Sequence, residues 1–254
     1  MDAIFTSLHD QSLLFALFTA VVAIPVGFLI NAAVAHLPMI LERQWQMQAR
    51  DVLGLPGGST TPCRSSKQRR NRTASRRQVC IALANSLLSG IVALHFGFGW
   101  SAVLMLMLTW GLLTMSLIDA EHLLLPDILV LPLLWFGLVV NSFHQFAELQ
   151  EALWGAVAGY MSLWCVLWLS KLITGHEGLG RGDLKLLAML GAWGGWQILP
   201  LTIILASTMG VAVRLMMIWL HRAERSEPIP FGPYLSVAGW SALVVMPGVS
   251  IFNL

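Results

Sequence analysis

Long apolar runs, separated by short polar segments, occupy most of the chain. A helix needs about 20 apolar residues to cross the hydrocarbon core of a bilayer, and eight runs come close to that length. They cover roughly residues 12–35, 79–97, 101–118, 128–145, 152–173, 184–200, 201–220 and 231–251. The boundary between the sixth and seventh runs is the weakest, because it is marked by Pro200 alone. The pattern predicts an all-α, polytopic integral membrane helical bundle with about eight transmembrane helices.

One sizeable polar segment, residues 37–78, lies between the first two runs. It is rich in Gly, Ser, Thr, Pro and Arg, and it has too little apolar surface to fold alone. We therefore divide the chain into a first transmembrane segment (1–36), a basic, flexible cytoplasmic loop (37–78) and a membrane-embedded domain (79–254). The loop has no interleaved aromatic residues, which argues against nucleic-acid binding. Its composition fits a solvated loop that only sets the topology, or a loop that binds anionic lipid headgroups.

The placement of the charges predicts the orientation in the membrane. The chain has 57% hydrophobic and 11% charged residues, whereas soluble domains have about 25% charged residues. Nine of its fifteen Lys and Arg residues lie between Arg43 and Arg77. With eight alternating spans the other six fall on or near the same side. By the positive-inside rule this side is cytoplasmic, and both termini face outward. Seven spans would break this segregation of charge.

The three cysteines, Cys63, Cys80 and Cys165, form no C-x-x-C pair. Zinc sites usually have such a local pair, so the sequence predicts no metal site.

Three aspartates fall at the cytoplasmic ends of predicted spans, where ionisable groups tend to be functional. Asp119 ends the third span, Asp127 begins the fourth and Asp183 begins the sixth. Two facing carboxylates that share one proton can activate a water and polarise a peptide carbonyl, as in aspartic proteases. Gly180 and Gly182 lack Cβ atoms, so a substrate backbone could approach closely beside Asp183.

Other interpretations fit some of the same residues. A proton-coupled membrane transporter also uses membrane carboxylates and glycine-interrupted helices, although it would favour acids near the bilayer midplane. A dinucleotide-binding loop is disfavoured because Asp183 stands where its third glycine should be. Asp127 follows Pro126 and could serve only as a first-turn acid at a helix N-terminus.

Four stretches of the chain resemble the type IV prepilin peptidases, which are bacterial inner-membrane aspartic proteases. They are LIDAEHLLLPDILVLPLLWFGL (117–138), GLGRGDLKLLAMLGAWGGW (178–196), IPFGPYLSVAGW (229–240) and, less closely, GFLINAAVAHLPMILERQW (27–45). The second contains the G-x-G-D motif of the family, and the resemblance fails mainly in the basic loop. There, many family members carry two C-x-x-C pairs, whereas this chain has only Cys63 in the loop and Cys80 just after it.

The resemblance implies that Asp119 and Asp183 form the catalytic pair, with Asp119 preferred to Asp127. It implies cleavage of the short, basic leader of type IV prepilins or type II secretion pseudopilins, at the cytoplasmic face of the bacterial inner membrane. We expect Glu121, Asp127 and Glu177 to attract the basic leader. Proteolysis would need no cofactor. Many family members also methylate the new N-terminus with S-adenosylmethionine, which remains an open possibility for this chain.

Overall fold

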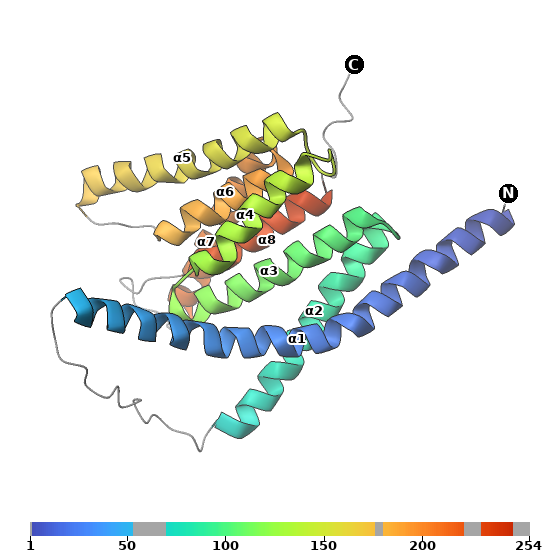
Figure 1. Cartoon of the computed structure of the whole chain (residues 1–254), viewed down its shortest axis with the longest axis horizontal. Coiled ribbons are helices and arrows are strands. Elements are labelled where there is room, and N and C mark those ends of the chain that lie inside the picture. The colour runs from blue at the N-terminus through green and yellow to red at the C-terminus, as the bar shows by residue number, and fades with distance from the viewer. Residues whose placement is uncertain (1, 53–69, 176–179, 221–229, 246–254) are drawn as a thin grey trace. The chain divides into compact units, whose positions relative to one another are not determined.

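The computed structural model describes residues 2–52, 70–175, 180–220 and 230–245. Within these ranges the backbone forms eight α-helices and no strand (Figure 1). The helices are α1 (Asp2–Val52), α2 (Arg70–Phe96), α3 (Trp100–His122), α4 (Asp127–Asn141), α5 (Leu149–Thr174), α6 (Arg181–Gly194), α7 (Ile198–Trp219) and α8 (Gly232–Val245). The predicted all-α, polytopic membrane architecture is confirmed.

Five of the described helices are long and apolar enough to cross a membrane. The candidate spans are Leu13–Leu41, Arg76–Phe96, Trp100–His122, Leu149–Ile173 and Ile198–Trp219. Helices α4, α6 and α8 have 15, 14 and 14 residues. At about 1.5 Å per residue, α4 and α6 are shorter than the roughly 30 Å hydrocarbon core. The fourth and sixth apolar runs therefore form helices shorter than the spans that the sequence predicts for them, and α8 is described as far as Val245.

The boundary between α6 and α7 differs from the prediction at Pro200. Helix α6 ends at Gly194, and Gly195 takes a left-handed φ of 76° that stops the helix. Its N–H donates to the Gly191 carbonyl at 2.9 Å. Pro200 instead lies in the first turn of α7. A proline is tolerated there because first-turn N–H groups have no intrahelical acceptor. A glycine, rather than the proline, separates the two helices.

The chain divides into two compact units, Met1–Phe98 and Gly99–Leu254. In the first unit α1 packs on α2, and Gly27 is so close to α2 that a Cβ would lie 2.6 Å from the Ala82 Cα. The Asn85 amide donates to the Ala23 carbonyl at 2.7 Å. The two helices extend into the predicted loop 37–78 from both sides, ending at Val52 and resuming at Arg70. Residues 53–69 lie outside the described part.

In the second unit, α6 is the central helix. It contacts α4, α5, α7 and α8, and Figure 1 shows α5 and α4 on either side of it. All residues from Asp183 to Trp193 are buried except Lys185. The α5–α6 contact is made by glycines: Cβ atoms added to Gly155 or Gly191 would collide with the backbone of the facing helix. Such close backbone approach is typical of helix packing in membranes, and it packs the short α6 closely against α5.

The buried Asn141, the last residue of α4, binds the C-terminal end of α6. Its amide donates to the Ala192 and Trp193 carbonyls, both at 2.9 Å. Its carbonyl oxygen accepts from the Phe146 and Ala147 N–H groups, both at 3.1 Å. The first two bonds satisfy carbonyls that the end of α6 leaves unpaired, and the other two satisfy buried N–H groups of the connection between α4 and α5. The C-terminal end of α4 is therefore tied to the C-terminal end of α6.

Candidate active site

The C-terminal end of α3 places the first candidate aspartate. Leu123 takes a left-handed φ of 53°, and its N–H donates to the Asp119 carbonyl at 2.9 Å. This cap ends α3 one turn after Asp119. The segment 123–126 then leads into α4, which begins at Asp127. The sequence LIDAEHLLLPD therefore forms a helix end, a short connection and a new helix start.

The side chain of Asp119 is 6% exposed and faces the start of α8. Its Oδ2 accepts the backbone N–H of Gly232 at 3.0 Å. The N-terminus of a helix carries a partial positive charge and free N–H groups, which stabilise an anion. Helix α8 thus supplies a donor to a carboxylate 113 positions earlier in the chain.

Asp183 lies in the first turn of α6 and is 5% exposed. Its carboxylate accepts the N–H of Gly180, the residue that precedes α6, as the acid of a capping box does. Its Oδ1 is buried and has no hydrogen-bond partner among the described residues. Burial, and then the nearby charge of Asp119, raise the pKa of Asp183 from 3.8 to about 7, although the Gly180 N–H opposes this shift. At neutral pH this carboxyl therefore readily holds a proton.

A cavity of about 210 Å³ brings the two acids together. Its walls come from the end of α3, the connection to α4 and the first turn of α6. They comprise Asp119, Leu123, Leu124, Leu125, Asp127, Gly180, Arg181, Gly182, Asp183 and Lys185. A cavity of this size can admit water, and the two buried carboxylates that line it are the groups that acid–base hydrolysis requires.

The two glycines expected beside a substrate both line this cavity. Gly180 is exposed, whereas Gly182 is half-buried against Leu125. A Cβ on Gly182 would lie 2.6 Å from the Leu125 Cβ. Packing therefore requires a glycine at position 182, which the sequence did not reveal. The missing side chain lets the start of α6 approach the 123–126 connection.

The three acids expected to attract a basic leader have different surroundings. Glu121 is exposed in the last turn of α3. Asp127 lines the cavity, but its two oxygens both lie 2.7 Å from the Lys185 Nζ. Glu177 lies outside the described residues. Nothing in the sequence indicated that Lys185 pairs with Asp127, apart from the position of Lys185 two residues after Asp183.

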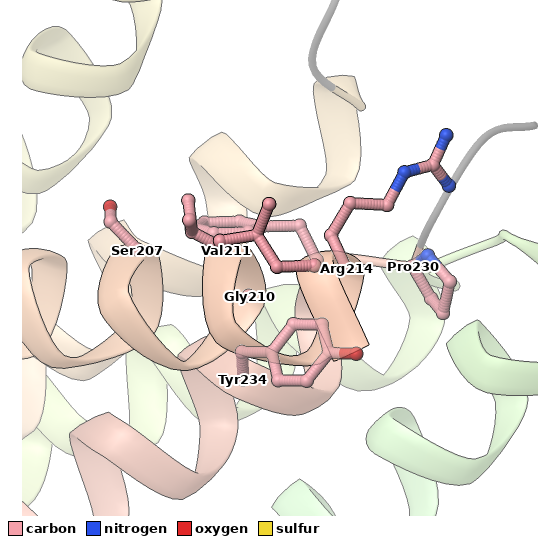
Figure 2. Close-up of a pocket in the computed structure, with 8 residues that line it drawn as sticks. Ser207, Gly210, Val211, Arg214, Pro230 and Tyr234 are labelled. Carbon is pink, nitrogen blue, oxygen red and sulfur yellow. The ribbon is translucent and has the colours of Figure 1, made fainter. Parts of the chain in front are cut away.

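A second, larger cavity of about 350 Å³ lies between α7 and the start of α8 (Figure 2). Figure 2 shows Ser207, Val211 and Arg214 on α7, with Tyr234 and Pro230 completing the wall. Neither aspartate lines it, so it is not the site of carboxylate chemistry. Phe231, which also lines it, immediately precedes Gly232.

Within the described ranges, no group of three or more His, Cys, Asp or Glu residues could hold a metal ion.

Gly232 is the residue of this site that the sequence analysis did not single out. The available signal was the Gly-Pro pair ahead of an apolar run, which is typical of a helix start. Nothing in that pair indicated which side chain the helix start would face.

Comparison with known proteins points to one family. Residues 106–215, which include both aspartates, match the model of the type IV leader peptidase family. The chain is 47% identical to the prepilin leader peptidase/N-methyltransferase of Stutzerimonas stutzeri, over 93% of each chain. It is 48% identical to the protein of that name from Pseudomonas aeruginosa, over 93% of this chain and 92% of the relative. With that of Aeromonas hydrophila the identity is 38%, over 86% and 87%. No solved structure matches the chain.

Proposed function

Because the chain belongs to the type IV leader peptidase family and is thus a membrane-embedded peptidase, we propose that it is an aspartic endopeptidase whose catalytic pair is Asp119 and Asp183. The observation that carries this proposal is the placement of two buried carboxylates in one cavity, with the pKa of Asp183 raised to about 7. Burial and mutual repulsion favour one shared proton over two negative charges.

The pair can perform hydrolysis without a covalent intermediate. The ionised carboxylate takes a proton from a water, and the oxygen of that water attacks the carbonyl carbon of the scissile peptide bond. The protonated carboxyl donates its proton to the carbonyl oxygen, which gives a neutral tetrahedral intermediate. The carboxylate that gave up its proton then takes one from a hydroxyl of the intermediate, the C–N bond breaks, and the amine leaves with a proton returned by the carboxyl that first accepted one. The unpartnered Oδ1 of Asp183 is suited to contact the reacting groups.

Cleavage assays with single variants test the catalytic pair. We expect Asp119→Asn and Asp183→Asn each to abolish cleavage of a prepilin by the purified enzyme, while the folded protein persists. Asp127→Asn is the matched control, because Asp127 lines the same cavity but is ion-paired to Lys185. It should retain the kcat of the wild type, whatever its effect on KM for a basic leader. If either Asp119→Asn or Asp183→Asn cleaves at the wild-type rate, the assignment of the pair is wrong.

The proposed substrates are type IV prepilins or type II secretion pseudopilins. The curated relatives are named for prepilin leaders, and this favours a peptidase over the proton-coupled transporter that composition alone leaves open. The chain is a multi-pass membrane protein, and we place its cavity at the cytoplasmic face. The support is the charge map: Lys and Arg are concentrated in the loop after the first span, and the segments on the other side lack them.

The relatives' names also include N-methyltransferase, and we infer the same second activity here, with S-adenosylmethionine as methyl donor. We assign no residue to methyl transfer. Incubation with a prepilin and methyl-labelled S-adenosylmethionine tests it: label should appear on the cleaved product, and unlabelled product would refute the second activity.

A further inference from the structure

The first residue of α8, Gly232, touches the carboxylate of Asp119 in two ways. Its backbone N–H donates to the Asp119 Oδ2 at 3.0 Å. Its Cα is also so close that a Cβ would lie 2.7 Å from Oδ2 and 3.0 Å from the Cγ of the carboxyl group. Both residues are buried, so neither can move into solvent to relieve such a collision.

We propose that Gly232 is a positioning residue for the reaction: its N–H orients the Asp119 carboxylate toward the cavity, and its missing side chain leaves the space that this orientation needs. The proposal rests on the proposed role of Asp119 in catalysis. Its physical basis is that a backbone donor at a helix N-terminus stabilises the ionised carboxylate. The neighbouring residue cannot replace it, because Pro233 has no N–H to donate.

Other glycines of the second unit have a different use. A Cβ on Gly239, about two turns further along α8, would collide with the Leu190 side chain. That contact concerns helix packing and involves the flexible end of a leucine. Gly239→Ala is therefore a matched control for Gly232→Ala: it crowds the same helix with the same added methyl group, but away from the carboxylate.

Steady-state kinetics on a prepilin distinguish positioning from packing. We expect Gly232→Ala to lower kcat by about 10-fold to 100-fold, which is the scale for a misplaced catalytic group, and to leave KM nearly unchanged. The acidic limb of the pH profile of kcat/KM should move to higher pH, because a weakened donor makes the carboxylate harder to ionise. Gly239→Ala should leave the pH profile in place. An unaltered kcat and profile in Gly232→Ala would overturn the proposal.

A second measurement does not depend on activity. If the added methyl group meets the Asp119 carboxylate, removing that carboxylate should relieve the collision. We expect Gly232→Ala to lower the melting temperature of the wild-type protein, and to lower it much less in an Asp119→Ala background. Gly239→Ala should lower it equally in both backgrounds. Equal losses for Gly232→Ala in both backgrounds would refute the contact.

The two measurements separate this proposal from the catalytic assignment. Should Asp119→Asn still cleave, the proposed function fails, whereas the thermal coupling between positions 119 and 232 can still be observed. Should Gly232→Ala fail to accumulate, recovery of folded protein in the Asp119→Ala, Gly232→Ala double variant supports the contact. Absence of folded protein in both variants, with Asp119→Ala alone folded, counts against it.

Discussion

The Nζ of Lys185 lies 2.7 Å from each carboxylate oxygen of Asp127. This ion pair joins the first turn of α4 to the first turn of α6, beside the cavity that holds Asp119 and Asp183. The sequence suggested that Asp127 attracts a basic leader, but the structure shows that its charge is already matched by a lysine. A leader that binds there must compete with Lys185.

Neutralising Lys185 tests this competition. We expect Lys185→Gln to lower KM for a prepilin with a basic leader, because Asp127 is then free to bind it. The folded stability should change by only about 0–1 kcal/mol, since both partners are partly exposed and the pair is screened by solvent. The measurement is KM for the normal leader and for one whose Lys and Arg residues are Gln. Identical effects on both leaders would show that Asp127 does not bind leader charge.

The close backbone approach of α5 and α6 makes a second prediction. A Cβ on Gly159 would lie 2.7 Å from the Leu187 carbonyl oxygen and 3.1 Å from the Ala188 Cα. Backbone atoms cannot rotate away, so Gly159→Ala must push the helices apart. We expect a loss of about 1–3 kcal/mol in stability, measured as a lower melting temperature.

Gly210→Ala is the control for this effect, because the nearest neighbours of its Cβ would be ring carbons of Tyr234 and Phe231 at 3.5 Å and beyond. It should melt close to the wild type. Equal melting temperatures for Gly159→Ala and Gly210→Ala would mean that the α5–α6 contact contributes little to stability.

The helices and the proposed catalytic pair were accessible from the sequence for different reasons. Long apolar runs predict membrane helices directly. The G-x-G-D motif, with its resemblance to the family, pointed to Asp183. The predicted start of α7 was wrong because Pro200 was interpreted as the boundary between two helices. A proline in the first turn is compatible with a helix. The contacts of Gly232 with Asp119 and of Lys185 with Asp127 could not be predicted. They join residues 113 and 58 positions apart, and no local pattern encodes such a pairing.

The raised pKa of Asp183 predicts how activity depends on pH. Burial and the charge of Asp119 bring this pKa to about 7. Catalysis needs one proton on the pair, so cleavage should fall as pH rises above about 7 and that proton is lost. The check is kcat/KM for one prepilin across the pH range in a fixed detergent or lipid. A profile that stays flat well into the alkaline range would contradict it.

Folded stability should respond to the same group. Because the pKa of Asp183 is about 7 when folded, against 3.8 as its ordinary value, the folded protein binds more protons than the unfolded chain between these limits. Its free energy of unfolding should therefore fall as pH rises from about 4 to about 7. Asp183→Asn removes this contribution. The melting temperature of the wild type should drop more steeply over this window than that of the variant; parallel curves would argue against the shifted pKa.

The proposed cytoplasmic position of the cavity can be tested by labelling cysteines at the two ends of α4. Glu121 is exposed at the end where α3 leads into α4, and Ser142 is exposed just after α4 ends. Each is changed to Cys in a background with Cys63, Cys80 and Cys165 replaced by Ser.

A membrane-impermeant maleimide added to spheroplasts should label Ser142→Cys at once. Glu121→Cys should react only after the membrane is opened, because it lies on the cavity side of the bilayer. Both should react in detergent, which shows that each thiol is accessible in itself. The reverse pattern in spheroplasts would place the aspartates on the outer face and refute the orientation derived from the positive charges.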